Sequence, residues 1–103
     1  MKQFTVEIAD EAWVEIEGQI RFIAVDRKSP MNAARWSNRL LKAIDGLGLM
    51  PRLHTLDEYL TQEHGTNIYR IVFERRYLIY YTLNEVESRV MIVSFRHGAR
   101  HDH

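Results

Sequence analysis

The sequence predicts an α+β domain in which a helix hairpin packs on a largely antiparallel sheet, in the order β-α-α-β-β-β. Two segments in the first half repeat apolar residues every three or four positions, as amphipathic helices do. Three strand-like apolar runs, separated by short polar turns, occupy the last third. A chain of 103 residues is long enough for one hydrophobic core, so we expect a single domain over residues 1–103.

The composition narrows the classes of protein to consider. The chain has no cysteine, which is typical of a reducing cytoplasm and excludes thiolate metal sites. No apolar run approaches the roughly 20 residues of a membrane-spanning helix, and no signal peptide precedes the first strand pattern. We therefore expect a cytoplasmic protein without membrane contact. The 14 basic and 14 acidic residues balance, which argues against a primary role in binding nucleic acid.

The N-terminal part combines a short strand with the first helix. Apolar and polar residues alternate over residues 4–8, which predicts a half-buried strand. Asp10 and Glu11 then place negative charge where a helix N-terminus favours it, and Arg27 and Lys28 suit its C-terminal end. The apolar stripe of this helix consists of Ala12, Ile16, Ile20, Ile23 and Ala24.

A second helix follows at once. Ser29 is a favoured N-cap residue, and Pro30 is tolerated at the first helical position. Gly46, Gly48 and Pro51 end the helix. Because the connection between the two helices is short, they are expected to form an antiparallel hairpin. The apolar stripe of the second helix consists of Ala33, Trp36, Leu40, Ile44 and Leu47.

The remaining sequence predicts a long loop and three strands. Residues 52–66 show no periodicity, and loops of that length in small domains are usually functional or mobile. Strands are expected at Asn67–Phe73, Tyr77–Leu83 and Arg89–Phe95, joined by turns whose lengths suit antiparallel hairpins. The last two strands are apolar on both faces, so they are predicted at the centre of the sheet with the helices on one side.

The end of the last predicted strand is the first candidate functional segment, because Arg96–Arg100 reads Arg-His-Gly-Ala-Arg. Arg96 and Arg100 could bind carboxylates or phosphates through two hydrogen bonds each, and His97 could transfer protons near neutral pH. The alternative is a solvated strand end whose arginine stems cover apolar surface. The residues alone do not choose between these interpretations.

Arginines and tyrosines also interleave along two of the predicted strands. Such a mixture can stack bases and bind phosphates, or the tyrosines can fill the core while the arginines face water. The residues concerned are Arg70, Arg75 and Arg76 with Tyr69, Tyr77, Tyr80 and Tyr81.

Two further groups of residues carry weaker signals. His97, His101 and His103 lie close in sequence, but no cysteine or paired carboxylate accompanies them, so we expect no metal site and no cofactor. Trp13 and Trp36 lie on the two helices at positions that allow packing in the core or hairpin seam. If one of them faces outward, it becomes an anchor for a partner protein.

The order of these segments resembles the RelE/ParE toxins of bacterial type II toxin–antitoxin pairs over essentially the whole chain. No single piece is specific, but their order and spacing within about 100 residues are similar to that family. The matching pieces are Val6-Glu7-Ile8, Ala33-Ala34-Arg35-Trp36, Ile68-Tyr69-Arg70-Ile71-Val72, Tyr77-Leu78-Ile79-Tyr80-Tyr81 and Val93–Arg100.

The resemblance implies one of two activities. RelE-like members cut mRNA on the ribosome with cationic side chains and a tyrosine or histidine–tyrosine end to the last strand. In this chain such an endonuclease would use His97, Arg96 and a strand tyrosine such as Tyr80. However, the residues after His97 are Gly98 and Ala99, whose side chains cannot transfer a proton.

ParE-like members instead inhibit DNA gyrase without a catalytic site, and many end the last strand in a similar His-Gly-Arg-rich run. This chain looks closer to that branch, since Tyr77 also stands where some of the nucleases carry an arginine. The resemblance therefore implies a non-enzymatic toxin that causes growth arrest by protein–protein contact, with Arg96, His97 and Arg100 as contact residues. A ribosome-dependent mRNA endonuclease is the alternative.

The resemblance also implies a cognate antitoxin that wraps the helix hairpin and the sheet. Residues Arg70, Trp13 and Trp36 are further candidates for partner contacts. An apolar groove left exposed on the isolated chain would be the physical trace of such a partner. A third interpretation is a member without toxicity that keeps only antitoxin binding and operon regulation.

Overall fold

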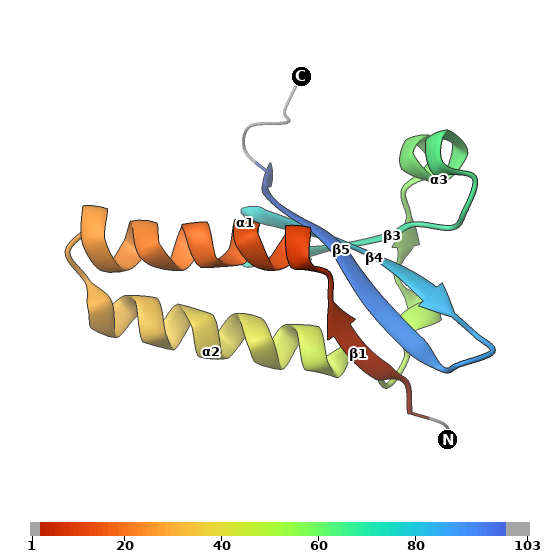
Figure 1. The fold of residues 1–103 in the computed structure, drawn as a ribbon, viewed down its shortest axis with the longest axis horizontal. Helices are drawn as coiled ribbons and strands as arrows, with labels where there is room; N and C mark the ends of the chain where they lie inside the picture. Colours follow the sequence, from red (N-terminus) through yellow and green to blue (C-terminus); the bar gives the residue numbers. More distant parts are fainter. Residues whose placement is uncertain (1–2, 99–103) are drawn as a thin grey trace.

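The computed structural model describes residues 3–98, and its strands form one sheet in the order β1-β5-β4-β3-β2 (Figure 1). The first strand pairs in parallel with the last one, and the other neighbours are antiparallel. This arrangement confirms the predicted α+β class and the central position of the last two strands. The strands are β1 Thr5–Ile8, β2 Thr55–Leu56, β3 Tyr69–Phe73, β4 Tyr77–Asn84 and β5 Arg89–His97.

The two long helices form the predicted hairpin and lie side by side (Figure 1). Helix α1 spans Asp10–Arg21 and continues into a π-helical turn, Phe22–Asp26, while α2 spans Pro30–Gly46. Ser29 occupies the N-cap position of α2 and Pro30 begins the helix, as predicted, although the Ser29 side chain makes no capping hydrogen bond. None of the helices within residues 3–98 combines the length and apolar character needed to cross a membrane.

The predicted structureless loop over residues 52–66 was wrong, because two short elements lie within it. Strand β2 adds an edge to the sheet, and helix α3 spans Glu58–His64 after a 3₁₀ turn at Pro51–Leu53. The Asp57 side chain caps α3 by accepting the Leu60 N–H at 2.9 Å. These elements are too short to show a hydrophobic period, which is why the sequence pattern missed them.

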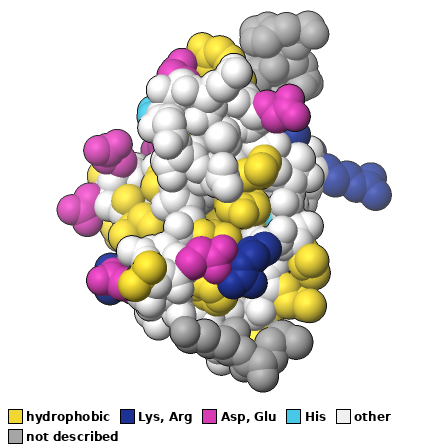
Figure 2. Space-filling view, turned by 90° about the vertical axis from the view of Figure 1, so that its right-hand side faces the viewer, with side chains coloured by type: hydrophobic (Ala, Val, Ile, Leu, Met, Phe, Trp, Pro, Cys, Tyr) yellow, Lys and Arg dark blue, Asp and Glu magenta, His cyan; other side chains and the backbone are white. Residues whose placement is uncertain are grey.

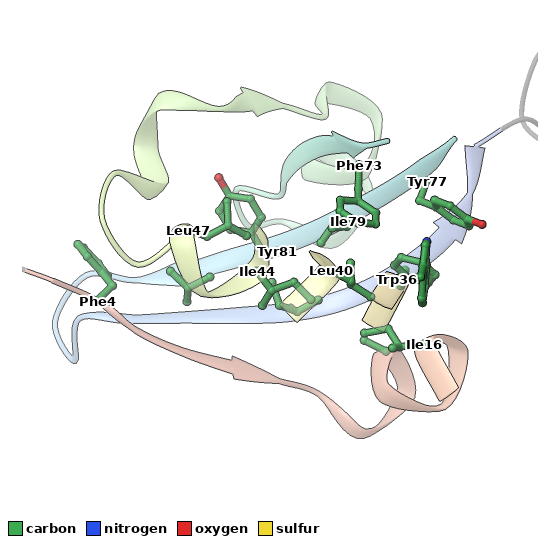
Figure 3. Close-up of a cluster of buried hydrophobic side chains, with 14 residues drawn as sticks. Phe4, Ile16, Trp36, Leu40, Ile44, Leu47, Phe73, Tyr77, Ile79 and Tyr81 are labelled. Atoms are coloured by element: carbon green, nitrogen blue, oxygen red, sulfur yellow. The ribbon is translucent and has the colours of Figure 1, made fainter. Parts of the chain in front are cut away.

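The core lies between the helix hairpin and one face of the sheet (Figure 3). Every residue of the apolar stripe predicted for α2 is buried, and α1 contributes Ala12 and Ile16. On the sheet, Ile79 and Tyr81 of β4 face the helices together with Ile92 and Phe95 of β5. The alternate residues of β4, such as Tyr80 and Thr82, point to the opposite face because side chains alternate along a strand.

The two tryptophans have different environments. Trp36 is 4% exposed and packs edge-on against Phe73, Tyr77 and Phe95, at ring-centroid distances of 6.0, 5.3 and 5.8 Å. It is therefore a core residue, and burial excludes it as an exposed partner anchor in the isolated chain. Trp13 is 37% exposed on α1 and keeps that possibility.

Candidate functional site

Arg96 and His97 end β5 and point to opposite faces of the sheet. In the strand register Arg96 lies opposite Leu78, whereas His97 lies opposite Tyr77. The Arg96 guanidinium carbon is 5.5 Å from the centroid of the Tyr80 ring, and its Nε donates to Ser94 Oγ at 3.1 Å. Of the three candidate catalytic residues, the structure thus brings Arg96 and Tyr80 together and places His97 on the other face of the sheet.

His97 belongs to the core side of the sheet. Its ring meets the Tyr77 ring edge-on, with centroids 5.1 Å apart and planes at 79°. Tyr77 in turn stacks on Phe95 at 5.2 Å, so His97 extends the aromatic cluster around Trp36. Its Nδ1 atom is buried and has no hydrogen-bond partner among residues 3–98. His97 therefore packs against the core at the end of β5, and its Nδ1 atom does not reach solvent.

The face that carries Arg96 forms the floor of a groove of about 810 Å³ between α1 and α3. Both apolar and charged side chains line it. The α1 wall consists of Glu11, Val14 and Glu15, the opposite wall of Leu60, His64, Thr66 and Ile68, and the floor of Tyr80, Thr82, Val93, Ser94 and Arg96. Because its walls are partly apolar, this groove matches the exposed trace that a protein partner would leave.

Glu15 fixes the strand end next to this groove. Strand β1 pairs with β5 only as far as Ile92, so the later backbone groups of β5 lack a strand partner on that side. The Phe95 N–H donates instead to Glu15 Oε1 at 3.1 Å. Helix α1 therefore supplies the hydrogen-bond acceptor that β1 no longer provides, and this bond fixes Phe95, the residue directly before Arg96. Nothing in the helical periodicity singled out Glu15, because an exposed glutamate on a helix is ordinary.

Arg70 lies on the same face as Tyr80, opposite it in the register of β3 and β4. Its Nη1 is 3.6 Å from Asp57 Oδ2, so a local carboxylate already neutralises part of its charge. Burial raises the pKa of the Tyr80 phenol, and Asp57 acts in the same direction, whereas Arg96 and Arg70 oppose it. Tyr80 therefore stays protonated at neutral pH, and its hydroxyl is able to donate a hydrogen bond.

The interleaved arginines and tyrosines do not form a base-stacking platform. Tyr81 is fully buried, stacks on Tyr69 at 5.3 Å and donates its hydroxyl to the Pro51 carbonyl at 2.7 Å. Tyr77 and Tyr80 are each 6% exposed. Figure 2 shows one face of the molecule, on which hydrophobic side chains alternate with acidic and basic ones, with no continuous basic surface. These observations favour the interpretation in which Tyr69, Tyr77 and Tyr81 pack in or against the core, while Tyr80 lies under Arg96 on the opposite face.

Some of the predicted site residues fall outside this description. Arg100, His101 and His103 lie beyond residues 3–98. Within that range no group of three or more histidine, aspartate or glutamate side chains is arranged to hold a metal ion. The site therefore rests on Arg96, Tyr80 and the groove walls.

Comparison with known proteins gives one family. The family model described as "ParE toxin of type II toxin-antitoxin system, parDE" matches residues 6–102 of the 103. The match covers the helix hairpin, α3 and nearly all of the sheet, so it concerns the whole fold and not one motif. No curated protein gives a significant match to the sequence.

Proposed function

We propose that this chain, which belongs to the ParE toxin family of type II toxin–antitoxin systems, arrests growth by inhibiting DNA gyrase through protein–protein contact. The family match over residues 6–102 carries the toxin part of this proposal. The separation of Arg96 from His97 supports contact, not catalysis, as the mode of action.

RNA cleavage would need a base and an acid that reach the same phosphodiester. His97 packs against Tyr77 on the core face, whereas Arg96 and Tyr80 lie on the groove face. A substrate bound over Arg96 would therefore meet a protonated phenol and a guanidinium but no general base from His97. This geometry disfavours the ribonuclease alternative.

The groove face carries the features of a contact surface for a protein. Arg96 is exposed and lies over an aromatic ring, and arginine and tyrosine are among the residues that dominate binding at interfaces. Val14, 67% exposed, adds apolar area on the neighbouring wall. We propose that Arg96, Arg70 and Arg100 contact the target, with His97 supporting the strand from below.

A cognate antitoxin would cover the apolar residues that the isolated chain leaves exposed. Several of them lie on the helix hairpin, which is the surface that the family resemblance assigns to that partner. The exposed large apolar residues of the hairpin are Trp13, Val14, Phe22, Val25, Met31 and Leu41. Their burial against an amphipathic segment would stabilise the complex by the hydrophobic effect.

The proposal is tested by pulse labelling of bacteria after induction of the chain, with thymidine and methionine incorporation followed in one culture. Thymidine incorporation is expected to fall first. With purified components, the chain should inhibit supercoiling by gyrase, and Arg96→Ala should weaken inhibition. Arg21→Ala, which removes an exposed arginine outside the groove, is the matched control.

Two other results would replace the proposal. If methionine incorporation falls first and His97→Ala abolishes mRNA cleavage, the chain is a ribosome-dependent endonuclease. If neither label responds while the chain still binds an antitoxin, it is a member without toxicity.

A further inference from the structure

A second hollow lies at the other end of the hairpin, between its tip and the β3–β4 turn. It has a volume of about 490 Å³, and we call it the hairpin-tip pocket. Its charged lining consists of Arg27 and Lys28 from the helix connection, Arg39 from α2, and Glu74 and Arg76 from the turn. It shares no lining residue with the groove beneath Arg96, so the proposed gyrase contact does not explain it.

The cations of this pocket exceed what the chain itself neutralises. Glu74, the single carboxylate among the lining residues, already binds Arg39, with Oε2 2.6 Å from Nε and Oε1 3.5 Å from Nη2. Arg27, Lys28 and Arg76 form no ion pair with any residue between 3 and 98. Three cations therefore face one hollow without a counter-charge from the described part of the chain.

The floor of the pocket adds hydrogen-bond donors. Trp36 lines it, is 4% exposed, and has a buried Nε1 atom without a hydrogen-bond partner among residues 3–98. An indole N–H can only donate, so the group that satisfies it must be an acceptor. In Figure 3 the indole nitrogen lies on the side of the ring that faces Tyr77. The Tyr77 hydroxyl accepts from Gln19 Nε2 at 3.0 Å, which leaves its own O–H able to donate.

The charges also act on this floor. Burial raises the pKa of the Tyr77 phenol, while Arg76 and Arg27 lower it. Both arginines are therefore close enough to stabilise a negative charge at the Tyr77 hydroxyl, which lines the pocket.

The backbone around the pocket has unusual conformations at both rims. Lys28, with φ of 52°, and Glu74 and Arg75, with φ of 50° and 63°, occupy the left-handed region without being glycine. The preceding turn of the hairpin, Phe22–Asp26, is π-helical, a conformation that occurs frequently at functional sites. Two of these three residues, Lys28 and Glu74, line the pocket.

We propose that the hairpin-tip pocket binds a carboxylate of an acidic peptide segment in a partner protein. A carboxylate offers the acceptors that the indole N–H, the phenol and the free guanidiniums lack, and arginine binds it through two hydrogen bonds. A peptide is favoured over a nucleic acid because the residues close in sequence to the lining include the apolar Phe22, Val25 and Met31, which are 44, 63 and 67% exposed. The segment therefore carries apolar residues beside its acidic one.

The test uses the full ¹⁵N-labelled chain and a capped hexapeptide of alternating glutamate and leucine. The Trp36 indole N–H resonance, assigned with Trp36→Phe, should shift as the peptide is added, and the peptide with glutamine in place of glutamate should leave it unmoved. Arg27→Gln and Arg76→Gln should each weaken binding about tenfold, as loss of a charge-assisted hydrogen bond does. Arg75→Gln, on the same turn but outside the lining, should keep full affinity.

Four results would overturn the proposal. The indole resonance could stay unmoved, or Arg75→Gln could weaken binding as much as Arg76→Gln. Inorganic phosphate at the same concentration could shift the resonance equally, which would make the pocket a general anion site. Asp102→Asn could shift it without any peptide, which would make the chain's own C-terminal segment the occupant. None of these readouts depends on gyrase inhibition or on growth arrest, so this proposal and the proposed function fail separately.

Discussion

Replacing Glu15 by alanine should loosen the end of β5, where Arg96 lies. The Glu15 carboxylate accepts the Phe95 N–H at 3.1 Å, at a point where β1 no longer covers β5. Phe95 itself is 4% exposed, so solvent has little access to replace the lost acceptor. Removing the carboxylate therefore leaves a backbone donor of the sheet without a partner.

The expected cost is about 1 kcal/mol in the free energy of unfolding, the lower end of the range for an unsatisfied donor, because the Glu15 side chain is itself exposed. Urea unfolding followed by tryptophan fluorescence measures this change. Amide exchange gives a local readout, since the Phe95 amide should exchange about fivefold faster if about 1 kcal/mol of local protection is lost.

Two further variants isolate the hydrogen bond from charge and helix propensity. Glu15→Gln keeps an acceptor at the same position and should retain most of the protection at Phe95. Glu17→Ala removes an exposed glutamate of the same helix and should change stability by less than about 0.5 kcal/mol. Equal effects of Glu15→Ala and Glu17→Ala, with unchanged exchange at Phe95, would refute the role given to this contact.

Three other predictions follow from burial and backbone geometry. Trp36→Ala should cost about 3–5 kcal/mol in urea unfolding, whereas Trp13→Ala should cost less than about 1 kcal/mol. Gly18→Ala should raise stability by about 1 kcal/mol, since a Cβ there meets nothing within 4 Å. Gly48→Ala should lower stability, because a Cβ there would lie 2.5 Å from the Phe4 carbonyl oxygen, and thermal melts of both variants measure these changes. Burial raises the pKa of Tyr81 above its usual 10, so its contribution to stability is present below pH 10 and is lost as pH rises further; Tyr81→Phe should flatten that alkaline decline in urea titrations.

Long elements were predictable from the sequence because periodicity accumulates over many residues. The stripe of α2 was predicted residue by residue, and the start of α1 at Asp10 followed from charge at a helix N-terminus. The three C-terminal strands also lie where alternation and turn residues predicted them. Helix α3 was missed because it is held by the Asp57 cap and by the hydrogen bond from the Ile68 N–H to Thr61 Oγ1, and neither leaves a repeating pattern.

The grouping of Arg96 with His97 shows a different limit. Adjacent residues of a strand point to opposite faces, so their separation was within reach of sequence reasoning once β5 was extended to His97. The predicted strand ended at Phe95, and that boundary made the two side chains look like one cluster. By contrast, the contact of Arg96 with Tyr80 depends on the β4–β5 register and its bulge, which only the folded sheet defines.

Gly98 lies between the two candidate surfaces, and close packing gives a structural reason for a glycine after His97. Its N–H donates to the Arg76 carbonyl, and a Cβ at this position would lie 3.0 Å from that carbonyl oxygen and 3.3 Å from the Leu78 side chain. A glycine after His97 therefore lets the end of β5 approach the start of β4 closely. Since Arg76 lines the hairpin-tip pocket and Arg96 lines the groove, this close approach joins the residues next to both surfaces at one end of the β4–β5 pair. Position 98 therefore lacks a side chain that could transfer a proton because a larger residue there would crowd the Arg76 carbonyl.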